Sequence, residues 1–188
     1  DGHVQFTSKI YVDEKRMDAM FIGVHDFDEQ KLDLIDKREG ELPDNRQVLT
    51  EVDNSKKAVY KGDIGDTFKV VDKQGEKTEI KISGKGRSLA YGWPPNAGIA
   101  AFYTDNQTIE NISGIEGFNV IEFDLHKIDN RSIEKTIKSI KYRLSNNTDN
   151  VTFAQMPEIR EQGTWPGKDQ MESTTSLLHI VAYIALFS

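Results

Sequence analysis

Four histidines are the first candidates for chemistry in this 188-residue chain, and their spacing argues against a metal site. His3, His25, His126 and His179 lie far apart, and none belongs to an HExxH or HxH pattern that would bring two imidazoles onto one cation. The segment from His25 to Asp28 could chelate a cation through its histidine and two aspartates. It also fits the end of a strand followed by a helix N-cap, which is the interpretation we favour. We therefore predict no metal ligands.

Two further patterns suggest a ligand or acid–base site. Ser83-Gly84-Lys85-Gly86-Arg87 combines cations with glycines, but it lacks the P-loop spacing and no helix pattern follows it, so we expect a flexible hairpin loop. Carboxylates such as Glu39 and Glu41 lie in polar loop sequence, where nothing favours the raised pKa of a general acid. The chain has no cysteine, which excludes thiol catalysis, zinc–thiolate sites and disulfides. We expect no catalytic or cofactor-binding residues, and we predict that the protein is not an enzyme.

Aromatic residues in turn sequences are more informative. Tyr91 and Trp93 lie next to Pro94-Pro95, and Trp165 precedes Pro166-Gly167. Rings exposed on rigid turns are typical contact residues for a partner or an apolar substrate. The interpretation we favour is that each ring covers the end of a β-layer. If the rings make contact with a partner or substrate instead, Tyr91, Trp93 and Trp165 are the candidate contact residues.

Composition restricts the partners of the chain. The formal net charge is −7, from 24 Lys and Arg against 31 Asp and Glu, and it repels phosphate backbones. We expect no nucleic acid as a partner. The length suits one domain or two small subdomains, with a core that needs no disulfide or metal.

The hydrophobic pattern predicts an α+β fold. Period-two alternation predicts strands at 4–12, 19–24, 47–52, 67–71, 78–82, 98–103, 118–125 and 151–154. The turn residues 72–76 join two of these strands in a hairpin, and the polar segment 104–117 is expected to be a junction. A short helix is expected at 30–35, capped by Asp26 or Asp28, and another carries residues 58–60 after a cap within 53–55. A longer helix is predicted where Ile133, Ile137, Ile140 and Leu144 share one face.

This order of elements predicts two lobes. Residues 1–64 and 118–170 would form a ferredoxin-like split β-α-β lobe from both chain ends. Residues 65–117 would form an inserted β-rich lobe.

The last residues of the chain form an apolar run. A bilayer-spanning helix needs about 20 apolar residues, so we interpret 171–188 as the start of a membrane-connecting helix. A docked surface helix would keep a polar stripe, whereas here apolar residues occupy every helical face. The alternative is an amphipathic helix packed on the core. The residues of the predicted membrane segment are Leu177, Leu178, Ile180, Val181, Ile184, Leu186 and Phe187. Since strand-like sequence begins directly after Asp1, we also expect that an upstream segment has been cut away.

Several segments together resemble one transporter family. They are Gly40-Glu41-Leu42-Pro43, Val48-Leu49-Thr50-Glu51 and the passage from Lys61 to Phe68, followed by a hairpin and a strand-helix-strand unit near 118–153. This order resembles the extracytoplasmic (periplasmic) core domain of FtsX-like ABC transporter permeases, which include macrolide exporters and lipoprotein-releasing transporters. The motifs are loose, but the resemblance covers nearly the whole chain.

The resemblance implies a function and a location. The domain would lie between the first and second transmembrane helices, at the extracytoplasmic face of the cell membrane. It would be non-catalytic and would couple ATP-driven helix movement to substrate handling or export. Its partners would be a second permease subunit, identical or different, and a cytoplasmic ATP-binding cassette. The flanking helices would join it to the membrane.

Two other functions stay open at this point. One is an extracellular ligand-binding or sensor module, in which the Trp93 and Trp165 loops hold a ligand. The other is a hydrolase with an unrecognised active site, which would need a cleft of titrating residues that the sequence does not indicate.

Overall fold

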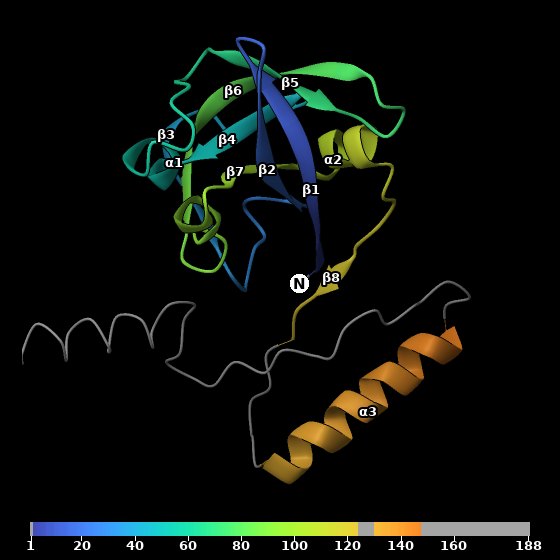
Figure 1. The fold of residues 1–188 in the computed structure, drawn as a ribbon. Helices are drawn as coiled ribbons and strands as arrows, with labels where there is room; N and C mark the ends of the chain where they lie inside the picture. Colours follow the sequence, from blue (N-terminus) through green and yellow to red (C-terminus); the bar gives the residue numbers. More distant parts are fainter. Residues whose placement is uncertain (1, 124–129, 148–188) are drawn as a thin grey trace, which may run out of the picture. The chain divides into compact units, whose positions relative to one another are not determined.

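The computed structural model describes residues 2–123 and 130–147 (Figure 1). The chain divides into two compact units, and the described residues of the first are 2–123, whereas those of the second form one helix. The strands are β1 (Gly2–Val12), β2 (Lys15–Val24), β3 (Ile35–Gly40), β4 (Gln47–Glu51), β5 (Thr67–Val71), β6 (Lys77–Ser88), β7 (Ala100–Asp105) and β8 (Val120–Ile121). The helices are α1 (Val52–Lys56), the 3-10 helix Pro94–Ala97, α2 (Asn106–Ser113) and α3 (Asn130–Asn147).

Six strands close into a barrel in the order β1-β2-β7-β4-β6-β5, with β5 pairing back to β1. The β2–β7 and β4–β6 pairs are parallel, and the other four pairs are antiparallel. In addition, β3 pairs with the second half of β6, and β8 pairs with the first residues of β1. Each of the six barrel strands therefore has a hydrogen-bonded neighbour on both sides, so none of them is an open sheet edge (Figure 1).

Aromatic rings fill the centre of the barrel. The larger hydrophobic cluster takes buried side chains from all six barrel strands and from α2. The centroid of the Phe102 ring lies 5.4 Å from that of Phe21, 4.7 Å from that of Phe68 and 5.2 Å from that of Tyr60. A second cluster uses the alternate residues of β2, β4 and β7, such as Tyr103. Because neighbouring residues of a strand point to opposite faces, the two clusters lie on opposite faces of these strands.

Most of the predicted strands are confirmed. The alternating segments at 4–12, 19–24, 47–52, 67–71, 78–82 and 98–103 correspond to β1, β2, β4, β5, β6 and β7, and the β5–β6 hairpin turns within 72–76. The helix predicted from Ile133 to Leu144 lies within α3. In α3, Ile137 and Ile140 are half-buried while Lys135 is exposed, as expected for an amphipathic helix. The α+β class is thus confirmed in broad terms.

The ferredoxin-like arrangement is not confirmed. Strands β5, β6 and β7, from the segment predicted as an insert, pair with β1, β4 and β2 in one closed sheet. The predicted boundary at residues 64 and 65 therefore falls within a continuous barrel. From 118–170, the structure describes only β8, its flanking residues and α3, and the strand expected at 118–125 is limited to Val120–Ile121 in the described part.

The helix predicted at 30–35 is wrong. Residues 25–34 form a loop, in which the Asp26 carboxylate accepts a hydrogen bond from the Asp28 backbone at 2.8 Å. The Gln30 side chain donates to the Phe27 carbonyl at 2.8 Å and accepts from the Ile35 backbone N–H at 3.0 Å. These side-chain bonds satisfy backbone groups that a helix would otherwise pair, so the chain passes directly into β3.

The flexible loop predicted at Ser83–Arg87 is also wrong, since these residues belong to β6. Gly84 lies between β3 and β4, and a Cβ atom there would come within 2.5 Å of the Glu39 carbonyl oxygen. The glycine therefore permits close strand packing and does not provide flexibility.

Two helices differ from the prediction. The segment 104–117 contains α2, because the Asp105 carboxylate caps it by accepting from the Thr108 backbone at 2.8 Å, while Ile109 and Ile112 are buried in the core. Helix α1 begins earlier than expected, since its N-cap is Glu51, and it ends at Lys56 before residues 58–60.

The remaining predictions lie outside the described residues. They concern the strand at 151–154, Trp165 and the segment 171–188 with Leu177, Leu178, Ile180, Val181, Ile184, Leu186 and Phe187. Among the helices that the structure describes, none is long and apolar enough to cross a bilayer.

Candidate functional site

The aromatic turn identified in the sequence lies at one end of the barrel. This turn, residues 89–99, follows the last residue of β6, and Ser88 pairs there with Ile35 at the start of β3. The start of β1 lies at the same place, because the His3 and Tyr91 rings are 5.0 Å apart, centroid to centroid. Here His3 pairs with Val24 at the end of β2. We call this region the Tyr91 end of the barrel.

Tyr91 connects three segments at this end. Its hydroxyl donates to the Glu122 carboxylate and lies 3.4 Å from Asp33 Oδ2 and 3.5 Å from His3 Nδ1. These partners come from the residues after β8, from the 25–34 loop and from β1. The Tyr91 side chain is buried, so its ring joins segments within the barrel and is not a surface ring.

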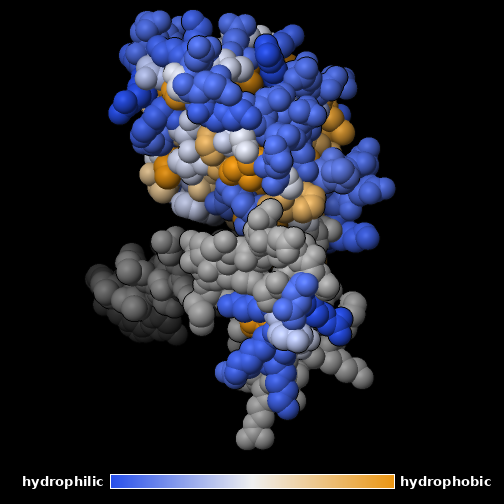
Figure 2. Space-filling model, turned by 90° about the vertical axis from the view of Figure 1, so that its right-hand side faces the viewer, coloured by the Kyte–Doolittle hydropathy of each residue, from blue (hydrophilic) through white to orange (hydrophobic). Residues whose placement is uncertain are grey.

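Apolar side chains are exposed around Tyr91. Trp93 is 42% exposed and Leu89 is 75% exposed. Leu34 directly precedes Ile35 of β3 and Leu89 directly follows Ser88 of β6, and Ile35 and Ser88 pair with each other. At the start of β1, Phe118 lies against Gly2, and Ile121 of β8 pairs with Gly2. Figure 2 shows hydrophobic residues gathered on the lower part of the barrel. We define the apolar end as the exposed side chains of Leu34, Leu89, Trp93, Phe118, Ile121 and Phe123.

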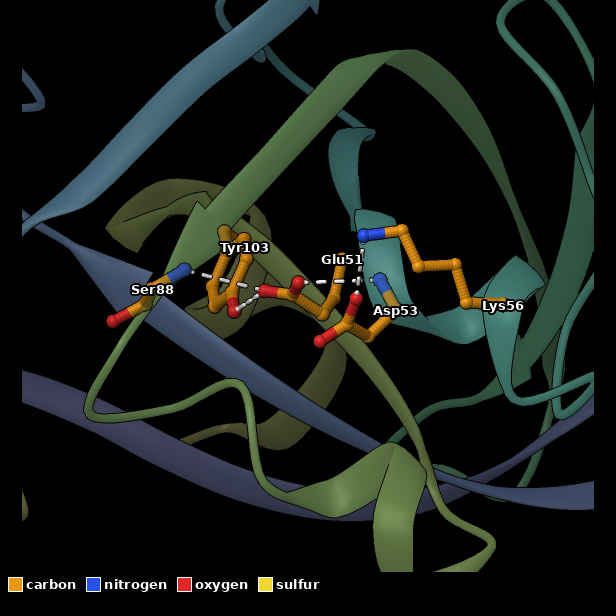
Figure 3. A network of polar contacts seen from close by, with 5 residues as sticks. All are labelled: Glu51, Asp53, Lys56, Ser88 and Tyr103. Carbon is orange, nitrogen blue, oxygen red and sulfur yellow. Dashed lines mark hydrogen bonds and ion pairs between the residues drawn. The ribbon is translucent and has the colours of Figure 1, made fainter. Parts of the chain in front are cut away.

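A buried carboxylate anchors the aromatic turn (Figure 3). Glu51 is 1% exposed, and its Oε2 accepts hydrogen bonds from the Tyr103 hydroxyl and, at 3.3 Å, from the Ser88 backbone N–H. Its Oε1 accepts from the Asp53 backbone N–H at 3.3 Å, and Asp53 forms an ion pair with Lys56 at 3.0 Å. The carboxylate therefore joins the end of β6 to β7 and to the first turn of α1.

Burial dominates the electrostatics of this network. Burial raises the pKa of Glu51 above its ordinary value of 4.5, although the hydrogen bonds from Tyr103, Asp53 and Ser88 lower it in part. Burial and the neighbouring Glu51 charge raise the pKa of Tyr103 as well. Since both side chains are almost fully buried, they are not placed to reach a substrate, and their role is to hold the structure.

Ser88 transmits this anchoring to the turn. Its Oγ accepts hydrogen bonds from the backbone N–H groups of Ala90 and Tyr91, both at 3.3 Å. A Cβ atom at Gly92 would collide with the Ser88 carbonyl oxygen, so a residue without a side chain is needed at this close approach. Trp93 follows directly and is the N-cap of the 3-10 helix Pro94–Ala97, whose two prolines are buried. The exposed indole is thus carried by a turn that is fixed to the core.

The structure places the predicted contact residues differently. Tyr91 is buried and Trp93, two residues later, is partly exposed. Trp165 lies outside the described residues. A contact role for Trp93 and Trp165 stays a prediction. In the part of the chain that the structure describes, no group of three His, Cys, Asp or Glu side chains is arranged to hold a metal ion.

Sequence reasoning missed Glu51 and the apolar end. The only local signal for Glu51 is a carboxylate directly after the buried Val48-Leu49-Thr50 of β4. Leu34 and Leu89 lie 55 positions apart, each beside another apolar residue, and nothing in the sequence brings them together.

Comparisons with known proteins give a fold relationship. No protein-family profile matches the chain, and no curated protein matches it in sequence. Among solved structures, the fold is similar to that of an extracellular domain from an ABC-type transporter. That structure is the crystal structure of the extracellular domain of the noncanonic transporter YknZ from Gram-positive bacteria, with a TM-score of 0.50 and 13% sequence identity. The match covers 78% of this chain and 73% of the YknZ domain. At this identity the similarity establishes a shared fold.

Proposed function

We propose that this protein is the extracytoplasmic domain of an ABC transporter permease at the cell membrane. The observation that carries the proposal is the fold similarity to the YknZ extracellular domain. It agrees with the resemblance of the sequence to FtsX-like permeases, which depends on different features, namely short motifs and the order of elements. The FtsX-like class, the coupling role and the partners are the finer parts of the proposal.

The path of the chain through the barrel suits a domain inserted between membrane helices. β1 is the first barrel strand, and β8, which follows the last one, pairs with it through Gly2–Ile121 and His3–Val120. The chain therefore enters and leaves the barrel at the same end. A domain that is connected to the membrane on both sides needs this arrangement, and the segment 171–188 would supply one of the two connections.

The rigidity of the barrel supports a role in transmitting movement. Closed inter-strand hydrogen bonding and the Glu51 anchor oppose local deformation of the Tyr91 end. Displacement of a connecting helix would then move the barrel as one body, which is what coupling to a cytoplasmic ATP-binding cassette requires. No step of this role needs a catalytic residue in the domain.

We assign the apolar end as the contact surface for a second permease subunit or an apolar substrate. Its six side chains are exposed to 42–75% and surround the place where the chain enters and leaves. Exposed apolar residues that gather at one site are typical of interaction surfaces. Trp93 is the best anchor, because its turn is already ordered and little entropy is lost on contact.

The proposal is tested on the gene and on the complete permease. The coding sequence should encode hydrophobic spans on both sides of this chain, with an ATP-binding cassette beside it, and the cassette should co-purify with the permease. In membranes, Leu89→Asp should reduce substrate-stimulated ATP turnover several-fold while the isolated domain keeps its melting temperature, because Leu89 is 75% exposed. Lys61→Asp, an exposed substitution away from the apolar end, is the control.

A freestanding gene without flanking spans would overturn the proposal. Spans without a cassette would favour the alternative of an extracellular sensor module. In that case, a small ligand should raise the melting temperature of the domain, and the Trp93→Ala variant should lose the effect.

A further inference from the structure

A second candidate site lies beside α2, where a cavity of about 340 Å³ opens to solvent. The lining comes from the turn before β4, from the β5–β6 turn with the first residues of β6, and from α2. The β5–β6 turn precedes β6, whereas the Tyr91 end follows β6, so the cavity is separate from the apolar end. It also does not depend on the transporter proposal.

Backbone contacts fix the cavity walls. The Arg46 N–H donates to Thr108 Oγ1 of α2, and the Arg46 carbonyl accepts from the Lys81 N–H, both at 3.0 Å. Arg46 has a φ angle of +58°, a conformation that costs a non-glycine residue energy and is kept here by these bonds. On the facing turn, the Lys73 N–H donates to the Ile112 carbonyl of α2 at 2.7 Å. Two cationic residues are thus held on the walls of one cavity.

The two cations have no ionic partner in the described part of the chain. None of the ion pairs there involves Arg46 or Lys73. Asp72 also lines the cavity, but its carboxylate accepts from the backbone N–H groups of Gln74 and Glu76 and from the Thr78 hydroxyl, all at 2.9 Å. Asp72 is therefore the internal acceptor of its own turn. With Asp72 in the same lining, Arg46 and Lys73 still leave the cavity with an excess of positive charge, although the chain has a net charge of −7, and this excess favours an anion.

The other lining groups indicate what the anion carries. Asn45, Gln74 and Asn111 supply side-chain amides, each able to donate to and accept from a hydroxyl group. Thr78 adds a hydroxyl, and Ile112 is the one aliphatic side chain in the lining. No aromatic ring lines the cavity, so it offers no stacking surface for a nucleobase. The volume is at the lower end of the range for ligand pockets and suits a single sugar ring.

We propose that this cavity binds an anionic sugar, a monosaccharide unit that carries a phosphate or carboxylate group. Arg46 and Lys73 contact the anionic group, and the amides of Asn45, Gln74 and Asn111 contact the sugar hydroxyls. A free sugar phosphate and a sugar phosphate unit within a polymer share this chemistry.

Nuclear magnetic resonance titration of the ¹⁵N-labelled full chain tests the proposal. Glucose 1-phosphate should produce saturable shifts at the amides of Arg46, Lys73, Gln74 and Asn111. Glucose and inorganic phosphate, added separately, should each bind at least tenfold more weakly, because each lacks half of the recognised groups. The methyl diester of glucose 1-phosphate distinguishes the sources, since equal binding indicates a polymer unit and weaker binding indicates a free monoester. Glucuronate, which carries a carboxylate group in place of the phosphate, tests whether the cavity accepts a sugar carboxylate.

Variants decide whether the cavity is the site. Arg46→Ala and Lys73→Ala should each weaken binding at least tenfold, while Lys61→Ala, which removes an exposed cation outside the cavity, should leave it within twofold. Melting curves confirm that each variant is folded, and Arg46→Gln replaces Arg46→Ala if the alanine variant does not fold. The absence of saturable shifts, shifts centred elsewhere, or equal losses in all variants would overturn the assignment.

Discussion

At each end of β6 one carboxylate accepts hydrogen bonds from the backbone, and the difference in burial between the two carboxylates gives their pKa values shifts in opposite directions. Before β6, Asp72 accepts hydrogen bonds from the backbone N–H groups of Gln74 and Glu76. After β6, Glu51 accepts from the backbone N–H of Ser88. Burial raises the pKa of Glu51 against its hydrogen bonds. For Asp72 desolvation also favours a higher pKa, but the hydrogen bonds from Thr78 and the turn backbone together outweigh it and lower the pKa.

The difference explains what each carboxylate does. The donors around Asp72 lie at an exposed turn and can bond to water if the carboxylate is lost. Two of the donors to Glu51, the Tyr103 hydroxyl and the Ser88 N–H, belong to buried residues and have no such replacement. An unpaired buried donor costs more than the net gain of one hydrogen bond. Glu51 should therefore control global stability, whereas Asp72 should control local order at its turn.

The largest expected effect is that of Glu51→Ala. The substitution leaves the Tyr103 hydroxyl and the Ser88 N–H buried without an acceptor, and we expect a loss of about 2–4 kcal/mol in the free energy of unfolding. Urea unfolding followed by tryptophan fluorescence measures it. Glu51→Gln, which keeps one carbonyl oxygen, should lose less. Equal stability of Glu51→Ala and wild type would show that the network contributes nothing net.

Tyr103→Phe should have the next largest effect. It removes one donor from a buried carboxylate, at an expected cost of about 2 kcal/mol, and it should raise the pKa of Glu51 further, because this hydrogen bond lowers it. Urea unfolding gives the first quantity, and a carboxyl ¹³C titration gives the second. The matched control is Tyr60→Phe, because the Tyr60 hydroxyl makes no hydrogen bond among the described residues. A loss as large in Tyr60→Phe would assign the effect to packing.

Asp72→Ala should have a smaller and local effect. The amides of Gln74 and Glu76 lose their acceptor but remain accessible to water, so the melting temperature should change less than in Glu51→Ala. Hydrogen exchange should become faster at these two amides and stay unchanged at Ser88, at the other end of β6. Faster exchange along the whole of β6 would contradict the separation of the two ends.

Local patterns predicted most strands of this fold but not their arrangement. The alternation in β1 and the turn residues between β5 and β6 are local signals, and both were sufficient. Helix α2 was missed because Ile109 and Ile112 are its only buried apolar residues within polar sequence. Barrel closure depends on the parallel pairs β2–β7 and β4–β6, which join segments that are distant in the sequence. The hydrophobic periodicity within a strand does not indicate which other strand it pairs with.

The same distinction applies to the candidate site. Trp93 could be identified from the adjacent prolines, because the turn is encoded locally. The importance of Glu51 could not be identified, since its burial depends on Tyr103 and Ser88, which lie 52 and 37 positions away. An exposed glutamate at a strand end has the same local sequence.

The smallest expected effect, a pH dependence, has opposite signs at the two ends. Titration changes only the charge of a group and keeps most of its contacts, so it should matter less than deletion. For Glu51 the pKa is raised in the folded state, so the folded protein binds more protons above pH 4.5. Its contribution to stability should fall as the pH rises from 4.5 through the raised pKa. For Asp72 the pKa is lowered in the folded state from its ordinary value of 3.8. Its contribution to stability is therefore present above pH 3.8 and is lost as the pH falls through the lowered pKa.

Two neutral variants isolate these contributions from the other titrating groups. Urea unfolding of wild type, Glu51→Gln and Asp72→Asn between pH 3 and pH 7 gives two difference curves. The wild type minus Glu51→Gln curve should fall with rising pH, because the buried charge is increasingly formed. The wild type minus Asp72→Asn curve should rise at its acidic end and then level, because the donors of that turn favour the charged form. If the two curves had slopes of the same sign, burial would not explain the difference in pKa shift between the two carboxylates.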